Sequence, residues 1–217
     1  VEPAPGFDAT IRLAGSAAPT IAWAYPPADD ERAGDVWFDL EAGPLAFLSA
    51  PQAPLVGGYA WHTVLHEIGH ALGLKHGHEG EGQNVAALPE AADAMEFTIM
   101  TYRSYAGQPI VGSYRNEPGG YAQGLMPLDI VALQHLYVVN TAFRGGDTHY
   151  AISPDTAALI VDGTAEPAPI ANRVFRTLWD GGGENTRDLS AYATPLRLDL
   201  SPFRSAAAPA GVDLDVG

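Results

Sequence analysis

The segment from residue 66 to residue 76 concentrates the side chains best suited to chemistry. It reads HEIGHALGLKH, so His66 and His70 are separated by four positions. On a helix this spacing places both imidazoles on one face, where they can chelate a single metal ion. Gly73 can adopt a backbone conformation that turns the chain sharply, which would bring His76 back toward the same ion. Three neutral imidazoles with an open fourth position are typical of catalytic zinc.

Glu67 lies directly beside the first histidine of this segment. Catalytic zinc lowers the pKa of a bound water to about 7, and a neighbouring carboxylate can take a proton from that water and pass it to a leaving amine. A bare HExxH arises by chance in many helices, whereas the added glycine and third histidine each have a geometric reason. The sequence therefore predicts a hydrolytic zinc centre.

The elements that must position this centre are predicted on either side of it. The apolar residues between Trp61 and Leu74 recur at helical spacing, which predicts the helix that carries the first two histidines. Strands with partial alternation of apolar side chains are predicted before it, over residues 9–13, 20–25 and 35–40. Further helices are predicted after it, over residues 90–96 and 127–139. This mixture predicts an α+β fold.

The character of the chain changes after about residue 140. Short β-like runs alternate there with turns rich in glycine, proline and aspartate, over residues 158–161, 174–179 and 196–200. We therefore predict an α+β domain over residues 1–142 and a mainly β segment over residues 143–217.

The composition excludes several kinds of partner. The 217 residues include 26 acidic and 11 basic side chains, a formal net charge of −15, which leaves no electrostatic footprint for nucleic acid or for an anionic membrane surface. The chain has no cysteine, which excludes disulfides, thiolate zinc sites and cysteine nucleophiles. No apolar run approaches the roughly 18 residues of a membrane span.

The extended motif resembles that of the metzincin metalloproteases, in which a methionine in a tight turn lies beneath the metal. The segment TIMTY at residues 98–102 matches this turn and places Met100 in the methionine position. Tyr102 narrows the resemblance, because matrixins lack this tyrosine whereas astacins and serralysins have it. Astacins usually carry disulfides, so the absence of cysteine favours the serralysins.

Other segments resemble serralysins in the same order along the chain. They are DVWF at 35–38, PLDIVALQHLY at 127–137 and WDGGGENT at 179–186. The resemblance implies a metzincin catalytic domain over residues 1–142, with a twisted mixed sheet and a long active-site helix. It implies that residues 143–217 form the start of a calcium-binding β-roll.

The resemblance also implies the roles of individual residues. The zinc ligands and the catalytic glutamate correspond to His66, His70, His76 and Glu67. Tyr102 matches a tyrosine that can ligate zinc at rest and swing away to stabilise the oxyanion of the tetrahedral intermediate. Met100 matches the turn methionine, whose role is packing beneath the site.

Calcium is the second chemistry that the sequence indicates. Loops at residues 144–148 and 180–185 offer carboxylate and carbonyl oxygens, which hard cations prefer. By resemblance, these loops supply one shared site, and its ligands would be Arg144, Asp147, Asp180 and Gly182, some of them through carbonyl oxygens. Asn185 departs from the family, which has an aspartate there; its amide oxygen can still coordinate, but one charge is lost.

The resemblance implies a secreted zinc endopeptidase that acts on protein or peptide substrates. The substrate is expected to lie extended along an edge strand, which we place at residues 35–40. The resemblance also implies further partners, either a proteinaceous inhibitor or a cleaved segment of the protein's own chain. An intact enzyme of this family would be longer at both ends, because the N-terminal helix and the tandem β-roll nonapeptides do not appear in this sequence.

Two alternatives remain at this point. The chain could be a catalytically inactive, metal-stabilised binding module, although a structural zinc site has no need of Glu67. It could also be a metzincin of another subfamily, astacin-like or matrixin-like.

Overall fold

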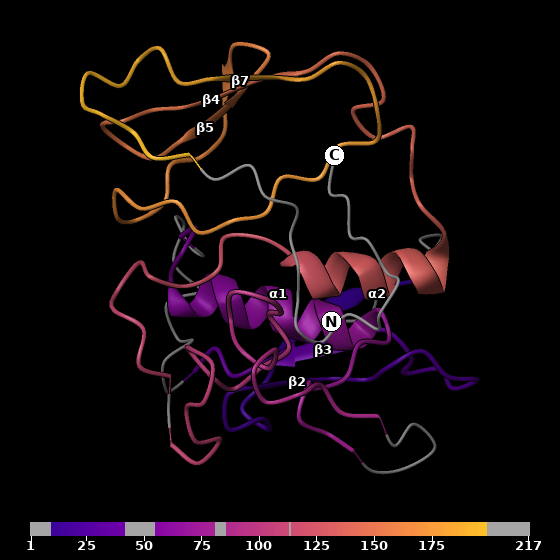
Figure 1. Ribbon diagram of the computed structural model, residues 1–217. Coiled ribbons are helices and arrows are strands. Elements are labelled where there is room, and N and C mark those ends of the chain that lie inside the picture. The colour runs from indigo at the N-terminus through magenta and orange to yellow at the C-terminus, as the bar shows by residue number, and fades with distance from the viewer. Residues whose placement is uncertain (1–9, 42–54, 81–85, 113, 199–217) are drawn as a thin grey trace.

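The computed structural model describes residues 10–41, 55–80, 86–112 and 114–198 (Figure 1). The elements in chain order are β1 (Arg12–Gly15), β2 (Ala22–Ala24), β3 (Asp35–Phe38), α1 (Tyr59–Ala71), α2 (Pro127–Tyr137), β4 (His149–Ile152), β5 (Leu159–Val161), β6 (Thr164–Ala165) and β7 (Thr186–Asp188). In Figure 1, α1 lies between the strands β2 and β3 on one side and α2 on the other, and β4, β5 and β7 gather beyond α2.

The first sheet is mixed, as the resemblance to the metzincins implied. Its order is β1–β3–β2, with β1 parallel to β3 and β2 antiparallel to it. Val36 and Phe38 are buried against Ala60 and Ala71 of α1. This contact forms because alternate residues of β3 point to one face of the sheet. The sheet thereby fixes the position of the helix that carries the histidines.

The expectation that residues 35–40 form an edge strand is wrong. β3 lies in the middle of its sheet and is hydrogen-bonded to a neighbour on each side. Within the part of the chain that the structure describes, the edge strand on the side of α1 is β2. Strand order in a sheet is a non-local property, and the alternation of apolar residues in one strand does not reveal it.

Several predicted elements are shorter than expected or differ in kind. Residues 90–96 form turns in place of a helix. The N–H groups of Ala92 and Asp93 both donate to the carbonyl of Pro89, but no helix continues from this turn. Residues 174–179 form no regular secondary structure and belong to neither sheet, and residues 196–198 have no strand pairing. The remainder of the run predicted over 196–200 lies outside the described residues.

A second apolar cluster joins α1, α2 and the loop between them. Its buried members are Leu74, Met95, Ile99, Met100, Ala122 and Met126. Leu65 of α1 and Leu133 of α2 pack against this cluster. The cluster therefore fixes the loop around residue 100 beneath α1.

The second sheet has the order β6–β5–β4–β7, in which β4 is antiparallel to β5 and parallel to β7. It lies within the region predicted to be mainly β, while the division of the chain at residue 142 and the β-roll remain predictions. None of the helices in the described ranges is long and apolar enough to span a bilayer.

Candidate metal centre

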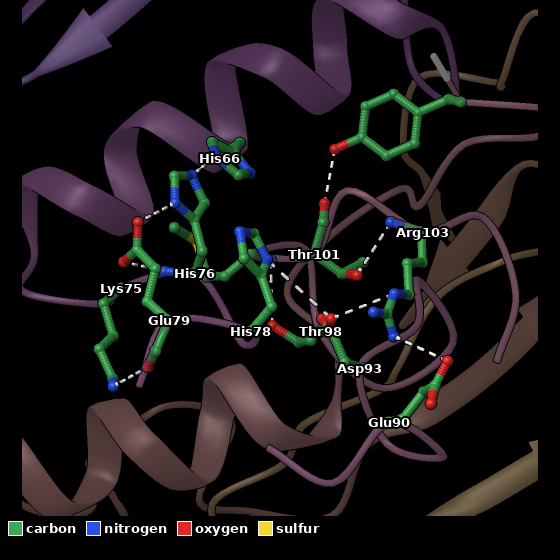
Figure 2. A network of polar contacts seen from close by, with 12 residues as sticks. His66, Lys75, His76, His78, Glu79, Glu90, Asp93, Thr98, Thr101 and Arg103 are labelled. Carbon is green, nitrogen blue, oxygen red and sulfur yellow. Dashed lines mark hydrogen bonds and ion pairs between the residues drawn. The ribbon is translucent and has the colours of Figure 1, made fainter. Parts of the chain in front are cut away.

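Three histidines converge at the C-terminal half of α1. His66 and His70 lie on one face of the helix, and the turn at Gly73 brings His76 to the same point. The Nε2 atom of His76 is 3.1 Å from that of His66 and 3.0 Å from that of His70 (Figure 2 shows His66 and His76). Gly73 has φ +95°, so the left-handed turn that the sequence predicted there is confirmed.

The second ring nitrogen of each histidine faces an acceptor. The Nδ1 atoms of His66 and His70 lie 2.7 Å and 2.9 Å from the carbonyl oxygens of Ile99 and Leu74, and Nδ1 of His76 lies 2.6 Å from a carboxylate oxygen of Glu79. Each Nδ1 therefore carries the proton in the neutral ring. The unprotonated Nε2 atoms then carry lone pairs, and those of His66 and His70 lie close to that of His76. These lone pairs repel one another, and a cation bound between them would replace the repulsion by coordination.

Burial keeps the first two imidazoles neutral. It lowers the pKa of His66 well below the ordinary value and lowers that of His70, and in both cases the neighbouring histidines add to the effect. Neutral imidazole is the form that ligates metal. Nε2 of His76 lies about 3 Å from Nε2 of both other histidines, and ligand atoms of all three lie within 4.8 Å of one another, which suits a tetrahedral zinc ion with bonds of about 2.0–2.1 Å.

Glu67 follows the first histidine on α1 and is only 7% exposed. Burial raises its pKa to about 7, and its Oε2 atom has no hydrogen-bond partner in the protein. A buried carboxylate oxygen without a partner is costly unless a proton donor reaches it. The arrangement suits a group that accepts a proton from a water molecule beside the histidines.

Tyr102 lies beside the three histidines, at the surface of the site. Its ring stacks on His66 with centroids 5.8 Å apart and lies 4.4 Å from the ring of His76, while 38% of the residue stays exposed. Burial of the hydroxyl and the nearby Glu67 carboxylate raise the pKa of Tyr102, which keeps the phenol protonated as a donor. The ring of Tyr102 therefore lies beside the histidines and is partly exposed to solvent.

Met100 packs directly beneath α1. The side chain is buried, and a Cβ atom added at Gly69 would lie 2.5 Å from its sulfur. The glycine inside the HEIGH motif therefore leaves room for the thioether against the helix backbone. This contact sets the separation between the histidine-bearing helix and the turn below it, in agreement with a packing role for Met100.

Asp129 ties that turn to α2, which sequence reasoning missed. Its buried carboxylate accepts hydrogen bonds from the Thr98 hydroxyl at 2.5 Å and from the backbone N–H groups of Ile99 at 2.9 Å and Met126 at 2.8 Å. Burial raises the pKa of Asp129 to about 6, and the three donors oppose this rise. Its place as the third residue of α2, a common capping position, is the signal that could have revealed it.

Replacing Asp129 with Ala is expected to lower the free energy of unfolding by about 3 kcal/mol, because three buried donors lose their acceptor. Urea denaturation followed by circular dichroism measures this change. The control is Asp155→Ala, at an exposed turn, which should shift the midpoint little. Equal midpoints for the two variants would show that Asp129 does not anchor the turn.

A cavity of about 700 Å³ opens beside the histidines. Its lining includes Glu67, Tyr102, Ala22 of β2 and Ile21 directly before that strand. Part of the remaining lining forms an aromatic wall. The wall consists of Tyr59, His62, Tyr114 and Tyr121. His62 and Tyr59 precede His66 on α1 at helical intervals, which is a detectable signal, whereas the tyrosines at 114 and 121 come from a loop with no periodic pattern.

The aromatic wall is fixed by hydrogen bonds. The Tyr114 hydroxyl donates to the carbonyl of Thr101 at 2.6 Å and lies 3.2 Å from Nε2 of His62. Burial lowers the pKa of His62 to about 4, so its ring stays neutral. The wall is therefore an uncharged surface with a few polar atoms.

An ionic network fixes the loops around the third histidine (Figure 2). Asp93 is 1% exposed, and its Oδ2 atom lies 3.5 Å from Nε of Arg103 and 4.0 Å from Nδ1 of His78. Arg103 also lies 3.7 Å from a carboxylate oxygen of Glu90. The network joins the loop after His76 to the segment that follows Met100.

The two loops predicted to bind calcium lie against each other. The Asp147 carboxylate accepts from the N–H of Glu184 at 2.8 Å, and the Asn185 side-chain oxygen accepts from the N–H of Thr148 at 2.9 Å. Asp180 accepts from the Gly182 N–H at 2.9 Å. The structure thus brings together both loops.

Side-chain oxygens of these loops already have partners. The Tyr150 hydroxyl donates to Oδ2 of Asp180 at 2.5 Å, and the Arg144 side chain turns away to Glu166 at 3.2 Å, so only its carbonyl could serve as a ligand. Among the described residues, the groups of three or more His, Cys, Asp or Glu side chains close enough to hold a metal all include His76. Calcium binding by these loops stays a prediction.

Comparison with known proteins agrees with this geometry. Residues 10–110 match Reprolysin_5, metallo-peptidase family M12. The chain is 31% identical over 186 residues to Serralysin C and 34% identical over 189 residues to Serralysin B, both from Dickeya chrysanthemi; each match covers 84% of this chain and 36% of the relative. It is 29% identical over 185 residues to Metalloprotease AprA of Pseudomonas entomophila (strain L48), covering 83% of this chain and 36% of that protein.

The mixed sheet and the helix with its histidines are compatible with the metzincin class, and the family match relates residues 10–110 to the metallopeptidases. Within that class the chain is of the serralysin type, which confirms the resemblance seen in its motifs. The chain spans about a third of the length of the serralysins that it matches.

Proposed function

We propose that this chain forms the catalytic part of a secreted zinc-dependent endopeptidase. The observation that carries the proposal is the convergence of three histidine Nε2 atoms beside a buried carboxylate oxygen without a partner, with His66 and Glu67 lining one cavity. His66, His70 and His76 would hold the metal, and Tyr102 lies close enough to their rings to be an additional ligand at rest. The relatives named serralysin support the reaction class.

Zinc, when bound, supplies Lewis-acid polarisation of the scissile carbonyl and of the attacking water. Glu67 takes a proton from that water as its oxygen attacks the carbonyl carbon. Glu67 then delivers the proton to the amide nitrogen as the C–N bond breaks, so an amine leaves. The Tyr102 hydroxyl donates a hydrogen bond to the oxygen that becomes negative in the transition state.

The substrate is proposed to pair with the edge of β2 that no other strand among the described residues occupies. The carbonyl of Ile21 and the N–H of Tyr25 bond toward β3, so the alternation along a strand directs the backbone groups of Ala22 and Ala24 to the opposite side. Ile21 and Ala22 also line the cavity that contains Glu67. An extended peptide added to this edge would therefore cross the centre.

Secretion, calcium binding and further partners belong to this proposal as well. The resemblance to serralysins supports secretion, and bound metal would stabilise a chain without cysteine in the way that disulfides do elsewhere. The apposed loops at 144–148 and 180–185 support a calcium site. A proteinaceous inhibitor or a cleaved segment of the protein's own chain would occupy the same cleft as the substrate.

Metal analysis combined with a protease assay tests the proposal. We expect mass spectrometry to find one zinc ion per purified chain, and we expect ortho-phenanthroline to abolish casein digestion and added zinc to restore it. The control is the meta isomer, which has the same rings but does not chelate. Protein without zinc, or digestion that resists the chelator, would overturn the proposal, and zinc without any digestion would favour a metal-stabilised binding module.

A further inference from the structure

The three histidines differ in the group that accepts a hydrogen bond from Nδ1. Backbone carbonyls accept from Nδ1 of His66 and His70, at 2.7 Å and 2.9 Å. A carboxylate accepts from Nδ1 of His76, since Oε1 of Glu79 lies at 2.6 Å. A carboxylate is a stronger acceptor than a carbonyl, and it makes the imidazole a better electron donor to a metal.

Several further hydrogen bonds fix the position of Glu79. Its second carboxylate oxygen accepts from the backbone N–H of His76 at 3.2 Å, and its own N–H bonds back to the carbonyl of His76 at 3.2 Å. The Lys75 ammonium donates to the backbone carbonyls of Glu79 and Ala86, which closes the loop on its other side. The Glu79 carboxylate therefore accepts hydrogen bonds from both the side chain and the backbone N–H of His76 (Figure 2).

His78 supports the same ring from a different direction. Its imidazole stacks on that of His76 with centroids 5.3 Å apart and an interplanar angle of 10°. The buried carboxylate of Asp93 lies 4.0 Å from Nδ1 of His78. His76 follows the end of α1, so unlike His66 and His70 it is not oriented by a helix, and these contacts replace the helix in fixing its direction.

We propose that Glu79 is a positioning residue for the third metal ligand: its carboxylate orients the ring, fixes the proton on Nδ1 and strengthens donation from Nε2. This inference rests on the proposed function, because it assumes that the three histidines hold zinc. Its consequence is that retention of zinc depends on a residue that does not touch the metal.

The test compares the release of zinc from Glu79→Ala, Glu79→Gln and the parent protein, with a chromogenic chelator in excess. We expect Glu79→Ala to release zinc about 10–100-fold faster, the range typical of losing such a partner. The amide of Glu79→Gln still accepts from Nδ1 but lacks the charge, so we expect an intermediate rate. The matched control is Glu31→Gln, an exposed acid in the loop before β3, which should release zinc at the parent rate.

Two further measurements separate positioning from a merely structural role. The unfolding midpoint of the zinc-free protein should shift little, because the Glu79 side chain is 46% exposed, while the visible absorption bands of the cobalt-substituted protein should shift in Glu79→Ala and Glu79→Gln. Release at the parent rate in Glu79→Ala, or a cobalt spectrum that does not change, would overturn the inference. A parent protein that holds no zinc would instead overturn the proposed function.

Discussion

Replacing Glu67 with Gln is expected to lower kcat by about 10²–10⁴-fold while zinc stays bound. The amide keeps the size of the side chain but cannot take a proton from water, and it occupies the same buried position on α1. The histidines are unchanged, so the zinc content should equal that of the parent protein. Initial rates with a fluorogenic peptide and metal analysis of the same sample measure both quantities.

The control for this prediction is Glu31→Gln, which removes the same charge from an exposed loop. It should leave kcat and zinc content unchanged. Residual turnover in Glu67→Gln within a few-fold of the parent would contradict the role of this carboxylate as the general base. Loss of zinc from Glu67→Gln would show that the carboxylate maintains the metal site instead.

Replacing Tyr102 with Phe is expected to lower kcat by about 10²–10³-fold and to change KM much less, as for the loss of one donor to a developing oxyanion. The ring contacts with His66 and His76 do not involve the hydroxyl, so zinc binding and stability should be kept. Steady-state kinetics on a peptide substrate separates kcat from KM.

Tyr105→Phe is the matched control, because this neighbouring tyrosine is exposed and does not line the cavity. It should behave as the parent enzyme. An unchanged kcat in Tyr102→Phe would remove the assigned role. An increase in KM alone would indicate that the hydroxyl contacts the bound substrate without favouring the transition state.

Local rules were sufficient to predict the centre of the site. The four-residue spacing of His66 and His70 determines their common face once a helix forms, and Gly73 has the positive φ that returns the chain toward His76. These relations depend on a few consecutive residues. The same is true of the alternating burial of β3, which the sequence indicated correctly.

The rest of the site depends on tertiary contacts. Tyr114 and Tyr121 reach the cavity from a loop far along the chain, and no spacing links them to His66. The edge strand was misassigned because β3 inserts between β1 and β2, a pairing that the sequence of one strand does not reveal. Residues 90–96 form turns in place of the predicted helix, and Asp93 within them is buried and faces Arg103, a contact that local spacing does not reveal.

The convergence of three lone pairs links the stability of the fold to the concentration of free zinc. Folding without a metal must bring Nε2 of His76 to about 3 Å from Nε2 of His66 and of His70 against the repulsion of their lone pairs. The unfolded chain does not have this repulsion. By mass action, a metal that binds only the folded chain adds about 2.7 kcal/mol of stability when its free concentration is about 100 times Kd. An environment that supplies zinc therefore selects the folded protein, and one that removes zinc favours its unfolding.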